Sequence, residues 1–533
     1  MPSFHTALAA CMALCLALTG CGGGSDAPAD PGLARTSEGL VRGQAAGELV
    51  SFLGIPYAAQ PVGALRWAPT AAAPARTDTL KAERMGPSCP QSGPGADTAT
   101  DEACLYLNVW KPAGAAPGAK LPVLVFMHGG AFVLGSGAQT DLREISRRQV
   151  VTVSFNYRLG ALGYLANPAL RAANKDGSMG NFALMDAIAA LQWVRRNIEA
   201  FGGDAGNITL WGLSAGATQT FSLLHSPKAR GLFHRAMMQS GGGAEYSNLS
   251  ADAATAVGDA AVKALGCAGA SDQVACLRAL PVAAILAAQG AGKWRPTVDG
   301  QVLTQVPLRA FATGDFNRVP VMVGGVYDEG TLFSDPGMSA AVYPLALRSL
   351  VPPGFDTAQI DAAYALSRFS SPGQGFARAT GDAMYACGNS VQRSTLSAWV
   401  PVFGWEMTDP AMSFPAQPKA YYYGSSHGMD AMYWAGGVDF LPSYPFLDAA
   451  VAAEVTSPSA LAQRKALSER MLGHLVNFMR MGDPNGAPGS AAPAWPRFAG
   501  ATERHLMHFT LPQSRVSNGE FEASHQCALW PVI

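Results

Sequence analysis

An apolar run that ends in a Gly-x-Ser-x-Gly turn constrains this chain more than any other feature. Residues 208–211 read Ile-Thr-Leu-Trp, Gly212-Leu213-Ser214-Ala215-Gly216 follows, and the next residues are compatible with a helix. A strand-to-helix turn this sharp leaves no space for side chains at its two glycines, and it exposes the serine hydroxyl at the corner. The pattern therefore predicts a nucleophile elbow with Ser214 as the nucleophile.

A second match to the same five-residue pattern occurs later in the chain. Gly424-Ser425-Ser426-His427-Gly428 fits it, but Met429-Asp430-Ala431 follows without a clear helix start. The strand, turn and helix context therefore selects Ser214 over Ser426. The alternative for either match is a simple glycine-rich turn.

Composition limits the classes of protein that this chain can represent. The 533 residues are 49% hydrophobic and 14% charged, which is enough apolar material for one large core or two ordinary ones. The formal net charge is -1, and no basic run occurs. Because nucleic-acid binding needs a basic surface, the chain is not expected to bind nucleic acid.

The N-terminus has the character of an export signal. The apolar segment Ala7–Leu18 is too short to span a bilayer, and it leads into Leu18-Thr19-Gly20-Cys21. This ending resembles a bacterial lipoprotein signal, in which the chain is cut before a cysteine that is then acylated. Several acyl chains would hold the protein stably at a membrane.

The signal resemblance predicts a signal peptide at 1–20 and acylation of Cys21. The glycine-rich run that begins at Gly22 predicts a flexible tether at 21–35, which leaves 36–533 for the catalytic domain. The protein is then an exported lipoprotein of the cell envelope, in the outer membrane or periplasm. No Lys or Arg precedes Arg35, whereas such signals normally begin with positive charge. The alternative is an ordinary secretory signal and a secreted protein.

Six cysteines remain beyond the signal, and an even number in an exported protein suggests three disulfides. Their spacing permits 15 pairings and does not choose among them. Free buried thiols are the alternative. The six are Cys89, Cys104, Cys267, Cys276, Cys387 and Cys527.

The arrangement of apolar runs predicts an α/β fold. Short runs without polar alternation are typical of strands covered on both faces, and they occur at 123–126, 150–153, 208–211, 236–238 and 321–323. Apolar residues at spacings of three and four predict a helix over 184–201, which Gly202-Gly203 ends. Strands that alternate with helices indicate a mostly parallel sheet.

A serine nucleophile needs a base and an acid, which follow it in this fold in the order serine, acid, histidine. His427 is the candidate base, because it lies on a small-residue loop shortly after the strand-like run 420–423, whereas His474 lies in a helical segment and His505, His508 and His525 in the C-terminal region. Asp328 and Glu329 both follow a strand-like run, and spacing does not separate them. A solvated turn is the alternative for the acids, and a loop histidine without a role is the alternative for His427.

Oxyanion stabilisation needs backbone N–H donors that already point at the developing charge. Phe126-Met127-His128-Gly129-Gly130-Ala131-Phe132 follows a predicted strand and resembles the His-Gly-Gly-Gly loop of esterases and lipases. By itself this segment also fits a glycine-rich turn.

Taken together, these residues resemble the type-B carboxylesterase family, which includes cholinesterases and many bacterial esterases of the α/β-hydrolase fold. The resemblance covers about residues 36–533 through motifs in the same order, which are Gly39-Leu40-Val41-Arg42-Gly43, Phe52-Leu53-Gly54-Ile55-Pro56-Tyr57-Ala58, Cys104-Leu105-Tyr106-Leu107-Asn108-Val109-Trp110, Asn156-Tyr157-Arg158-Leu159-Gly160, Phe201-Gly202-Gly203-Asp204, Gln239-Ser240-Gly241 and Gly482-Asp483-Pro484-Asn485. The fold implied is an α/β-hydrolase with a mostly parallel central sheet, helices on both faces and family insertions.

The resemblance also assigns roles to residues. It implies a triad of Ser214, Glu329 and His427, no metal or other cofactor, and a serine carboxylesterase that acts on small-molecule esters. The implied oxyanion donors are the N–H groups of Gly130, Ala131 and Ala215. The implied disulfides are Cys89–Cys104, Cys267–Cys276 and Cys387–Cys527. The alternatives are a lipase or polyester hydrolase with the same triad, and a non-catalytic binding protein of the cholinesterase type.

Two departures from the family pattern bear on the substrate. Leu213 stands before the nucleophile, where the family usually has glutamate. The segment from Cys89 to Cys104 contains no aromatic residue, so the tryptophan by which cholinesterases hold quaternary ammonium has no counterpart there. Choline esters are therefore not the expected substrates.

Overall fold

In the computed structural model, the helices and strands belong to one unit that runs from Pro31 to Ile533. The described residues are 30–93, 96–97, 99–243, 248–290, 294–409, 424–438, 457–486, 493–500 and 502–530. The predicted signal peptide 1–20, the predicted lipidation site Cys21 and the strand expected at 420–423 lie outside them. The predicted tether 21–35 differs at its end, because β1 (Leu33–Thr36) begins within it and pairs with β2 (Gly39–Arg42).

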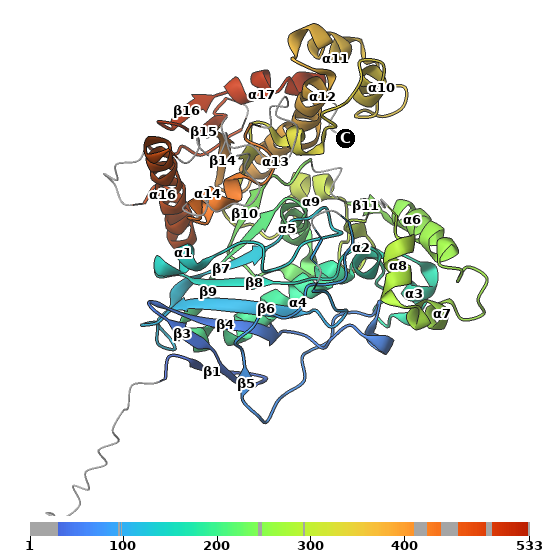
Figure 1. Ribbon diagram of the computed structural model, residues 1–533, viewed down its shortest axis with the longest axis vertical. Helices are drawn as coiled ribbons and strands as arrows, with labels where there is room; N and C mark the ends of the chain where they lie inside the picture. Colours follow the sequence, from blue (N-terminus) through green and yellow to red (C-terminus); the bar gives the residue numbers. More distant parts are fainter. Residues whose placement is uncertain are drawn as a thin grey trace, which may run out of the picture. The chain divides into compact units, whose positions relative to one another are not determined.

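A mixed sheet forms the centre of this unit (Figure 1). In spatial order its strands are β16 (Arg515–Asn518), β15 (His505–Thr510), β14 (Val402–Thr408), β13 (Val321–Val326), β10 (Arg235–Gln239), β9 (Gly203–Leu213), β7 (Leu121–Met127), β8 (Val151–Phe155), β6 (Tyr106–Pro112), β4 (Leu49–Pro56) and β3 (Gln44–Ala46). The adjacent strands from β15 through β8 in this order are parallel, and antiparallel pairs lie at both edges of the sheet. The sheet is therefore mostly parallel, as predicted.

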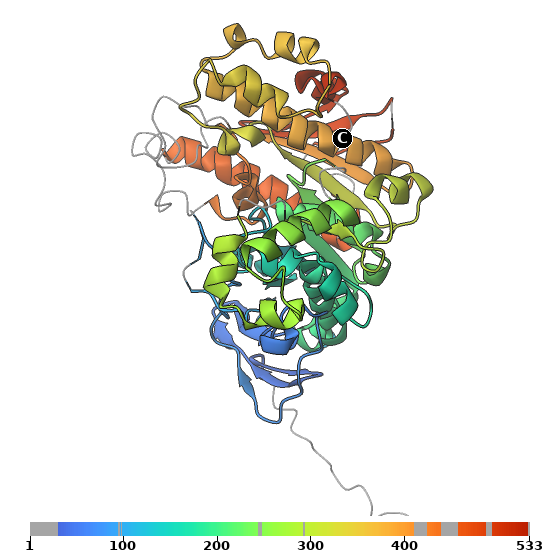
Figure 2. The ribbon, with the colours of Figure 1, turned by 90° about the vertical axis from the view of Figure 1, so that its right-hand side faces the viewer.

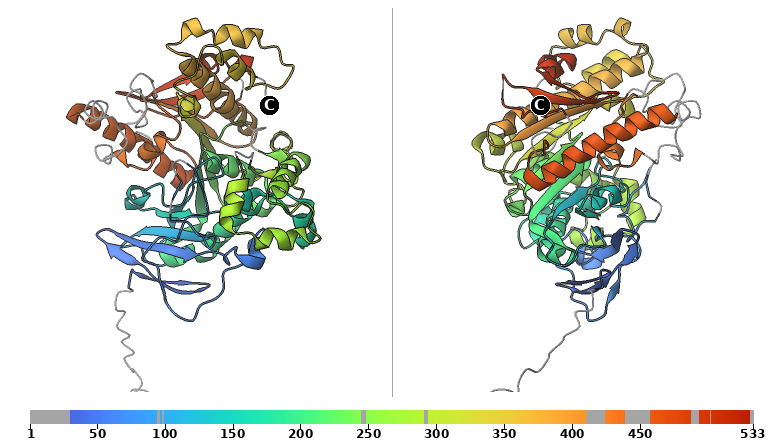
Figure 3. Two further views of the ribbon diagram at one scale, coloured as in Figure 1. Left: turned by 45° about the vertical axis from the view of Figure 1, so that its right-hand side comes forward. Right: turned by 90° about the vertical axis from the view of Figure 1, so that its left-hand side faces the viewer.

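Helices cover both faces of this sheet. Successive residues of a strand point to opposite faces of the sheet, so two consecutive residues of β7 show what packs on each face. Val125 packs in one core cluster with Leu191 of α4 (Phe182–Asn197), whereas Phe126 packs in a second with Leu475 of α16 (Pro458–Met481). Figure 3 shows α16 across one face, and Figure 2 shows the green helices in front of the other. The absence of polar alternation in the strand runs follows from this double coverage.

The helix predicted over 184–201 is present, as α4 followed by a 3-10 turn at Ile198–Phe201. Gly202 ends it with a φ of +84°, which glycine adopts without strain. The other α-helices within the described residues are α1 (Arg143–Arg147), α2 (Gly160–Tyr164), α3 (Pro168–Ala173), α5 (Ala215–His225), α6 (Ala251–Ala264), α7 (Gln273–Ala279), α8 (Val282–Ala288), α9 (Pro307–Thr313), α10 (Tyr343–Arg348), α11 (Ala358–Ala363), α12 (Pro372–Thr380), α13 (Cys387–Ser397), α14 (Asp430–Trp434) and α17 (Glu520–Ser524).

Small sheets and disulfides complete the unit. β5 (Leu80–Lys81) joins β2, and β11 (Leu249–Ser250) pairs with β12 (Thr297–Val298). The disulfides are Cys89–Cys104, Cys267–Cys276 and Cys387–Cys527, the three pairs that the family resemblance implied. Among the described helices, none is both long and apolar enough to cross a membrane.

Candidate active site

The turn between β9 and α5 holds Ser214 in a strained backbone conformation. Ser214 has a φ of 55° and a ψ of -121°, and it lies between the last residue of the strand and the first of the helix. Positive φ at a residue with a side chain persists only where the surroundings impose it. Here the Ser214 N–H donates to the carbonyl oxygen of Gln239 at 2.8 Å, and the Ser214 carbonyl accepts from the Thr218 N–H at 3.0 Å. The strand, turn and helix predicted around Ser214 are therefore present.

Close backbone approaches explain the two glycines of this turn. A Cβ at Gly212 would lie 2.3 Å from the carbonyl oxygen of Gly216. A Cβ at Gly216 would lie 2.1 Å from the carbonyl oxygen of Met127, at the end of β7. Only glycine lets α5 begin directly against the end of β7.

His427 lies between Ser214 and Glu329 and contacts both. Its Nε2 is 2.8 Å from Ser214 Oγ, and its Nδ1 is 2.5 Å from Glu329 Oε2. The side chains of His427 and Glu329 are 6% and 2% exposed. A carboxylate at Nδ1 keeps the proton of the neutral ring there, so Nε2 accepts the hydrogen bond from the serine hydroxyl. This arrangement can remove the proton from Ser214 and make its oxygen nucleophilic.

The Glu329 carboxylate is fixed by a second set of donors. Its Oε1 accepts hydrogen bonds from Ser240 Oγ at 2.6 Å and from the Val326 N–H at 3.0 Å. A Cβ at Gly325 would lie 2.1 Å from the same oxygen, so a glycine is required beside it. Ser240 belongs to the motif Gln239-Ser240-Gly241, which was the available signal for it, but the motif by itself does not reveal its role.

Asp328, the competing acid, has a different set of contacts. Its Oδ2 accepts from the Ser425 N–H at 2.9 Å, and its own N–H donates to the Ser425 carbonyl at 3.2 Å. Burial raises the pKa of Asp328 to about 6, against the opposing effect of the Ser425 hydrogen bond. Asp328 therefore connects the loop of Glu329 to the loop of His427, while Glu329 faces the imidazole.

The second Gly-x-Ser-x-Gly match does not form an elbow. Ser426 is fully buried, and its Oγ accepts a hydrogen bond from Thr331 Oγ1 at 3.1 Å. The expectation that no helix starts there is wrong, because α14 begins at Asp430, after a turn at His427–Met429. Ser426 forms an isolated bridge with Asp328, which explains its burial.

The loop after β7 brings backbone donors toward Ser214. A Cβ at Gly129 would lie 3.0 Å from Ser214 Cβ, so the loop and the serine are in contact. Gly130 and Ala131 have φ values of +118° and +51°. Ala215 is the first residue of α5, and its N–H has no partner within the helix. Within the described part of the chain, no group accepts a hydrogen bond from the N–H of Gly130, Ala131 or Ala215.

Two aromatic side chains pack against His427. The Phe333 ring lies 5.0 Å and the Tyr385 ring 4.8 Å from the imidazole, and the two aromatic rings stack on each other at 5.6 Å. Phe333 is 45% exposed, and Tyr385 lies in a π-helical turn at Gly381–Ala386. π-Helical turns are frequent at functional sites. Neither residue is predicted from the sequence, because no motif or spacing distinguishes them.

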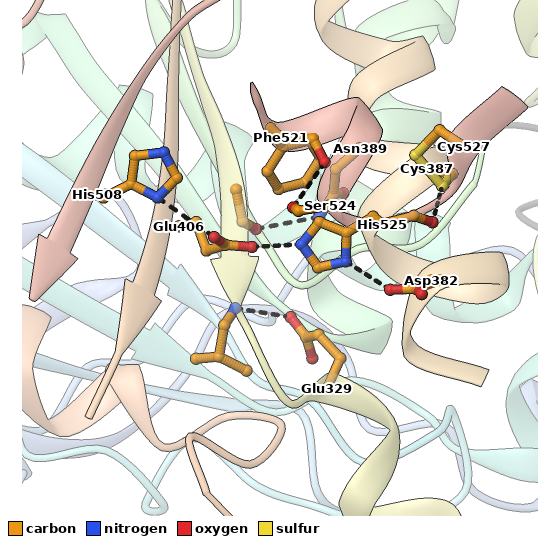
Figure 4. A network of polar contacts seen from close by, with 12 residues as sticks. Glu329, Asp382, Cys387, Asn389, Glu406, His508, Phe521, Ser524, His525 and Cys527 are labelled. Carbon is orange, nitrogen blue, oxygen red and sulfur yellow. Dashed lines mark hydrogen bonds and ion pairs between the residues drawn. A yellow bond between two sulfur atoms is a disulfide. The ribbon is translucent and has the colours of Figure 1, made fainter. Parts of the chain in front are cut away.

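The other C-terminal histidines serve different contacts. His474 lies in α16, and its Nδ1 is 2.8 Å from the carbonyl oxygen of Pro484, which follows that helix. Figure 4 shows His525 between Asp382 and Glu406, with His508 on the far side of Glu406. His525 Nδ1 lies 2.5 Å from Asp382 Oδ1, and its Nε2 lies 2.6 Å from Glu406 Oε1. Among the residues that the structure describes, no group of three His, Cys, Asp or Glu side chains could hold a metal ion.

The parallel sheet, the strained serine turn and the Ser–His–Glu contact place this protein in the class of α/β-hydrolases with a serine nucleophile. The family model described as the carboxylesterase family matches residues 30–530. The chain therefore belongs to the carboxylesterase family, as the motifs predicted.

Relatives in this family include bacterial and mammalian enzymes. The chain is 41% identical to the fumonisin B1 esterase of Sphingopyxis macrogoltabida over 318 residues, which is 57% of this chain and 58% of that protein. It is 30% identical to the acylcarnitine hydrolase of Rattus norvegicus over 526 residues, which is 89% of this chain and 87% of the relative.

Solved structures of similar proteins extend the likeness to the whole fold. A carboxylesterase of Geobacillus stearothermophilus matches with a TM-score of 0.76 and 28% identity, over 94% of this chain and 100% of that chain. A thermophilic PNB esterase matches with a TM-score of 0.78 and 26% identity, over 93% and 99%. The predicted α/β-hydrolase fold is confirmed.

Proposed function

We propose that the protein is a serine carboxylesterase that hydrolyses small-molecule esters through an acyl-enzyme on Ser214. The observation that carries the proposal is the placement of His427, within hydrogen-bond distance of both Ser214 Oγ and Glu329 Oε2. A base that is oriented by a carboxylate and contacts a serine hydroxyl is the arrangement that acyl transfer requires. No metal or other cofactor enters this chemistry.

The reaction proceeds in two halves. Ser214 Oγ attacks the ester carbonyl as His427 Nε2 takes its proton, and Glu329 stabilises the imidazolium that forms. The N–H groups of Gly130, Ala131 and Ala215 donate to the oxyanion of the tetrahedral intermediate. His427 then protonates the leaving alcohol. His427 then takes a proton from a water molecule as that water attacks the acyl carbon. It returns the proton to Ser214 Oγ as the acid leaves.

The surroundings of the triad favour neutral, apolar esters. Leu213 precedes the nucleophile, so no carboxylate stands at that position to attract a cation. The exposed part of Phe333 and the neighbouring Tyr385 ring offer an apolar surface beside His427. Apolar groups gain free energy by leaving water for such a surface.

A fluorophosphonate probe tests the nucleophile. Ser214→Ala abolishes covalent labelling and the hydrolysis of activated short-chain esters, whereas Ser426→Ala retains both. Circular dichroism of each variant establishes that it is folded. Labelling that persists in Ser214→Ala and is lost in Ser426→Ala would refute the assignment. A folded wild-type protein that neither labels nor hydrolyses esters would favour the non-catalytic alternative.

A lipase or polyester hydrolase is the second candidate, because a secreted triacylglycerol lipase of Gibberella zeae is 34% identical over 340 residues, 57% of its length. The triad chemistry would be the same, and the difference lies in the size of the acyl group. Rates over a series of acyl lengths separate the two. Rates that fall steeply beyond short chains support the carboxylesterase.

For location, we propose that residues 1–20 direct export and that the mature protein begins at acylated Cys21, ahead of a catalytic domain at 36–533. The Leu18-Thr19-Gly20-Cys21 ending supports this proposal. Mass spectrometry of the mature N-terminus tests it, and Cys21→Ser releases the protein from the membrane fraction with unchanged specific activity. An unmodified terminus at another residue would instead make the protein a secreted one.

A further inference from the structure

A small internal cavity adjoins Glu329 on the side of β14 and α13. Its volume is about 10 Å³, and all of its lining residues are buried. Figure 4 shows Glu329, Asn389, Glu406 and Phe521 of this lining. The lining residues are Gly325, Val326, Glu329, Ala386, Asn389, Arg393, Trp405, Glu406 and Phe521.

Arg393 brings a guanidinium group to this cavity. Its side chain is fully buried and passes over Gly404, where a Cβ would lie 2.7 Å from its Cδ. The guanidinium lies over the rings of Phe521 and Phe498, at 4.5 and 5.7 Å. No described side chain or backbone group accepts a hydrogen bond from any of its three nitrogens.

The charge of Arg393 persists at neutral pH. Burial lowers its pKa to about 10, while Glu522 and Glu406 act in the opposite direction. The aromatic rings attract the face of the cation, but they do not accept the N–H groups in the plane of the guanidinium. Buried donors of this kind are costly unless they are hydrogen-bonded.

Asn389 provides an acceptor in the same lining. Its side chain is 2% exposed, and its amide nitrogen donates to the Gly324 carbonyl at 3.4 Å. Its Oδ1 accepts from no group in the described part of the chain. The cavity therefore has unmatched donors from Arg393 and an unmatched acceptor from Asn389.

The carboxylates of the lining are already engaged. Glu406 contacts His525 and His508, and Glu329 contacts His427 and Ser240. An anion in the cavity would meet two carboxylates, and a cation would meet the guanidinium. The occupant that fits is neutral and both donates and accepts hydrogen bonds. The volume limits it to about one water molecule.

We propose that this cavity is a binding site for a single structural water molecule, which accepts a hydrogen bond from Arg393 and donates one to Asn389 Oδ1. The water gives one of the buried guanidinium donors an acceptor and gives Asn389 Oδ1 a donor. The water site has no part in the proposed esterase reaction, and its presence does not depend on that reaction.

High-resolution crystallography of the full-length protein tests the proposal. The expected result is one peak in the cavity, at about 2.7–3.2 Å from an Arg393 nitrogen and from Asn389 Oδ1. Crystals soaked in bromide or in rubidium should show no anomalous signal there. A bromide or rubidium peak would show that an ion occupies the cavity and would overturn the proposal. A cavity without electron density would also overturn it.

Variants distinguish the site from a packing defect. Asn389→Leu removes the acceptor and fills part of the volume, so the peak is lost. Ser390→Ala is the matched control on the same helix, because Ser390 Oγ contacts Glu522 and does not line the cavity. The control retains the peak. A peak that survives in Asn389→Leu, or disappears in Ser390→Ala, contradicts the proposed hydrogen bonds. None of these readouts depends on ester hydrolysis.

Discussion

Ser240 fixes the orientation of Glu329 from the end of a neighbouring strand. Its hydroxyl donates a 2.6 Å hydrogen bond to Oε1, while the other carboxylate oxygen lies 2.5 Å from His427 Nδ1. A carboxylate that is held on one oxygen presents the other in a single direction. The short polar side chain of Ser240 therefore contributes to the geometry of the proposed triad without contacting Ser214.

Glu329→Gln should lower kcat by orders of magnitude, up to about 10⁴-fold. An amide can donate to Nδ1 of His427 and thereby favour the tautomer with its proton on Nε2, which cannot accept the proton of Ser214. Steady-state kinetics with an activated short-chain ester measures the effect.

Asp328→Asn is the matched control for that prediction. The neighbouring carboxylate contacts the Ser425 backbone and not the imidazole, so its change should reduce kcat far less. Both variants should remain folded by circular dichroism. If the Asp328 variant were the severely impaired one, the assignment of the acid to Glu329 would be wrong.

The stability of the protein should fall as the pH rises from 7 to about 9. Burial alone lowers the pKa of His525, but Glu406 and Asp382 outweigh it and raise the pKa to about 9. A histidine whose pKa is higher in the folded state than in the unfolded state stabilises the folded state. This stabilisation is fully present below the ordinary pKa of 6.5, and it is lost as the pH rises through the folded-state pKa of about 9. The whole contribution is about 3 kcal/mol in the free energy of unfolding, and about 2 kcal/mol of it is lost between pH 7 and 9. Denaturant titrations at pH 7, 8 and 9 measure it.

His525→Gln should remove most of this pH dependence. Asp328 and Asp430, whose pKa values burial raises to about 6 and 7, titrate mainly below the tested range. His234→Gln is the control, because burial lowers the pKa of His234 and it does not titrate between pH 7 and 9. If the pH dependence of the free energy of unfolding remained in His525→Gln and vanished in His234→Gln, its assignment to His525 would be wrong.

Neutral esters should be better substrates than choline esters of the same acid. Quaternary ammonium binding uses an aromatic face and a nearby negative charge. The segment from Cys89 to Cys104 has no aromatic residue, and Leu213 puts no carboxylate beside Ser214. The loss of cation–π contact, about 0.5–2 kcal/mol, corresponds to up to about thirtyfold in relative kcat/KM. Matched ethyl and choline esters provide the measurement.

Leu213→Glu should narrow the difference between the two esters, since it introduces a carboxylate next to Ser214. Leu213→Gln is the matched control, because it is polar and uncharged and should leave the difference largely unchanged. A clear preference of the wild-type protein for choline esters would mean that another part of the site binds the cation.

The local features of this protein follow from its sequence. The glycines around Ser214 are dictated by backbone contacts within the turn and with the end of β7, so the motif predicts the elbow directly. The helix α4 follows from its apolar spacing, and the buried strands follow from runs without polar alternation. Motifs in a fixed order were sufficient to predict the family.

The contacts between side chains that are distant in the sequence depend on the packing of the whole fold. His427 contacts residues that lie 213 and 98 positions away in the chain, and no periodicity encodes such a contact. Spacing left Asp328 and Glu329 equivalent, whereas the end of β13 turns Glu329 toward the imidazole and Asp328 toward Ser425.

The same reason applies to the residues that no motif revealed. Tyr385 reaches His427 from a π-helical turn, and His525 joins Asp382 to Glu406 from the C-terminal segment. The cavity beside Arg393 exists because separate elements leave a space between them. Local sequence fixes conformation through backbone sterics and apolar periodicity, but contacts between distant side chains depend on how the packed elements bring them together.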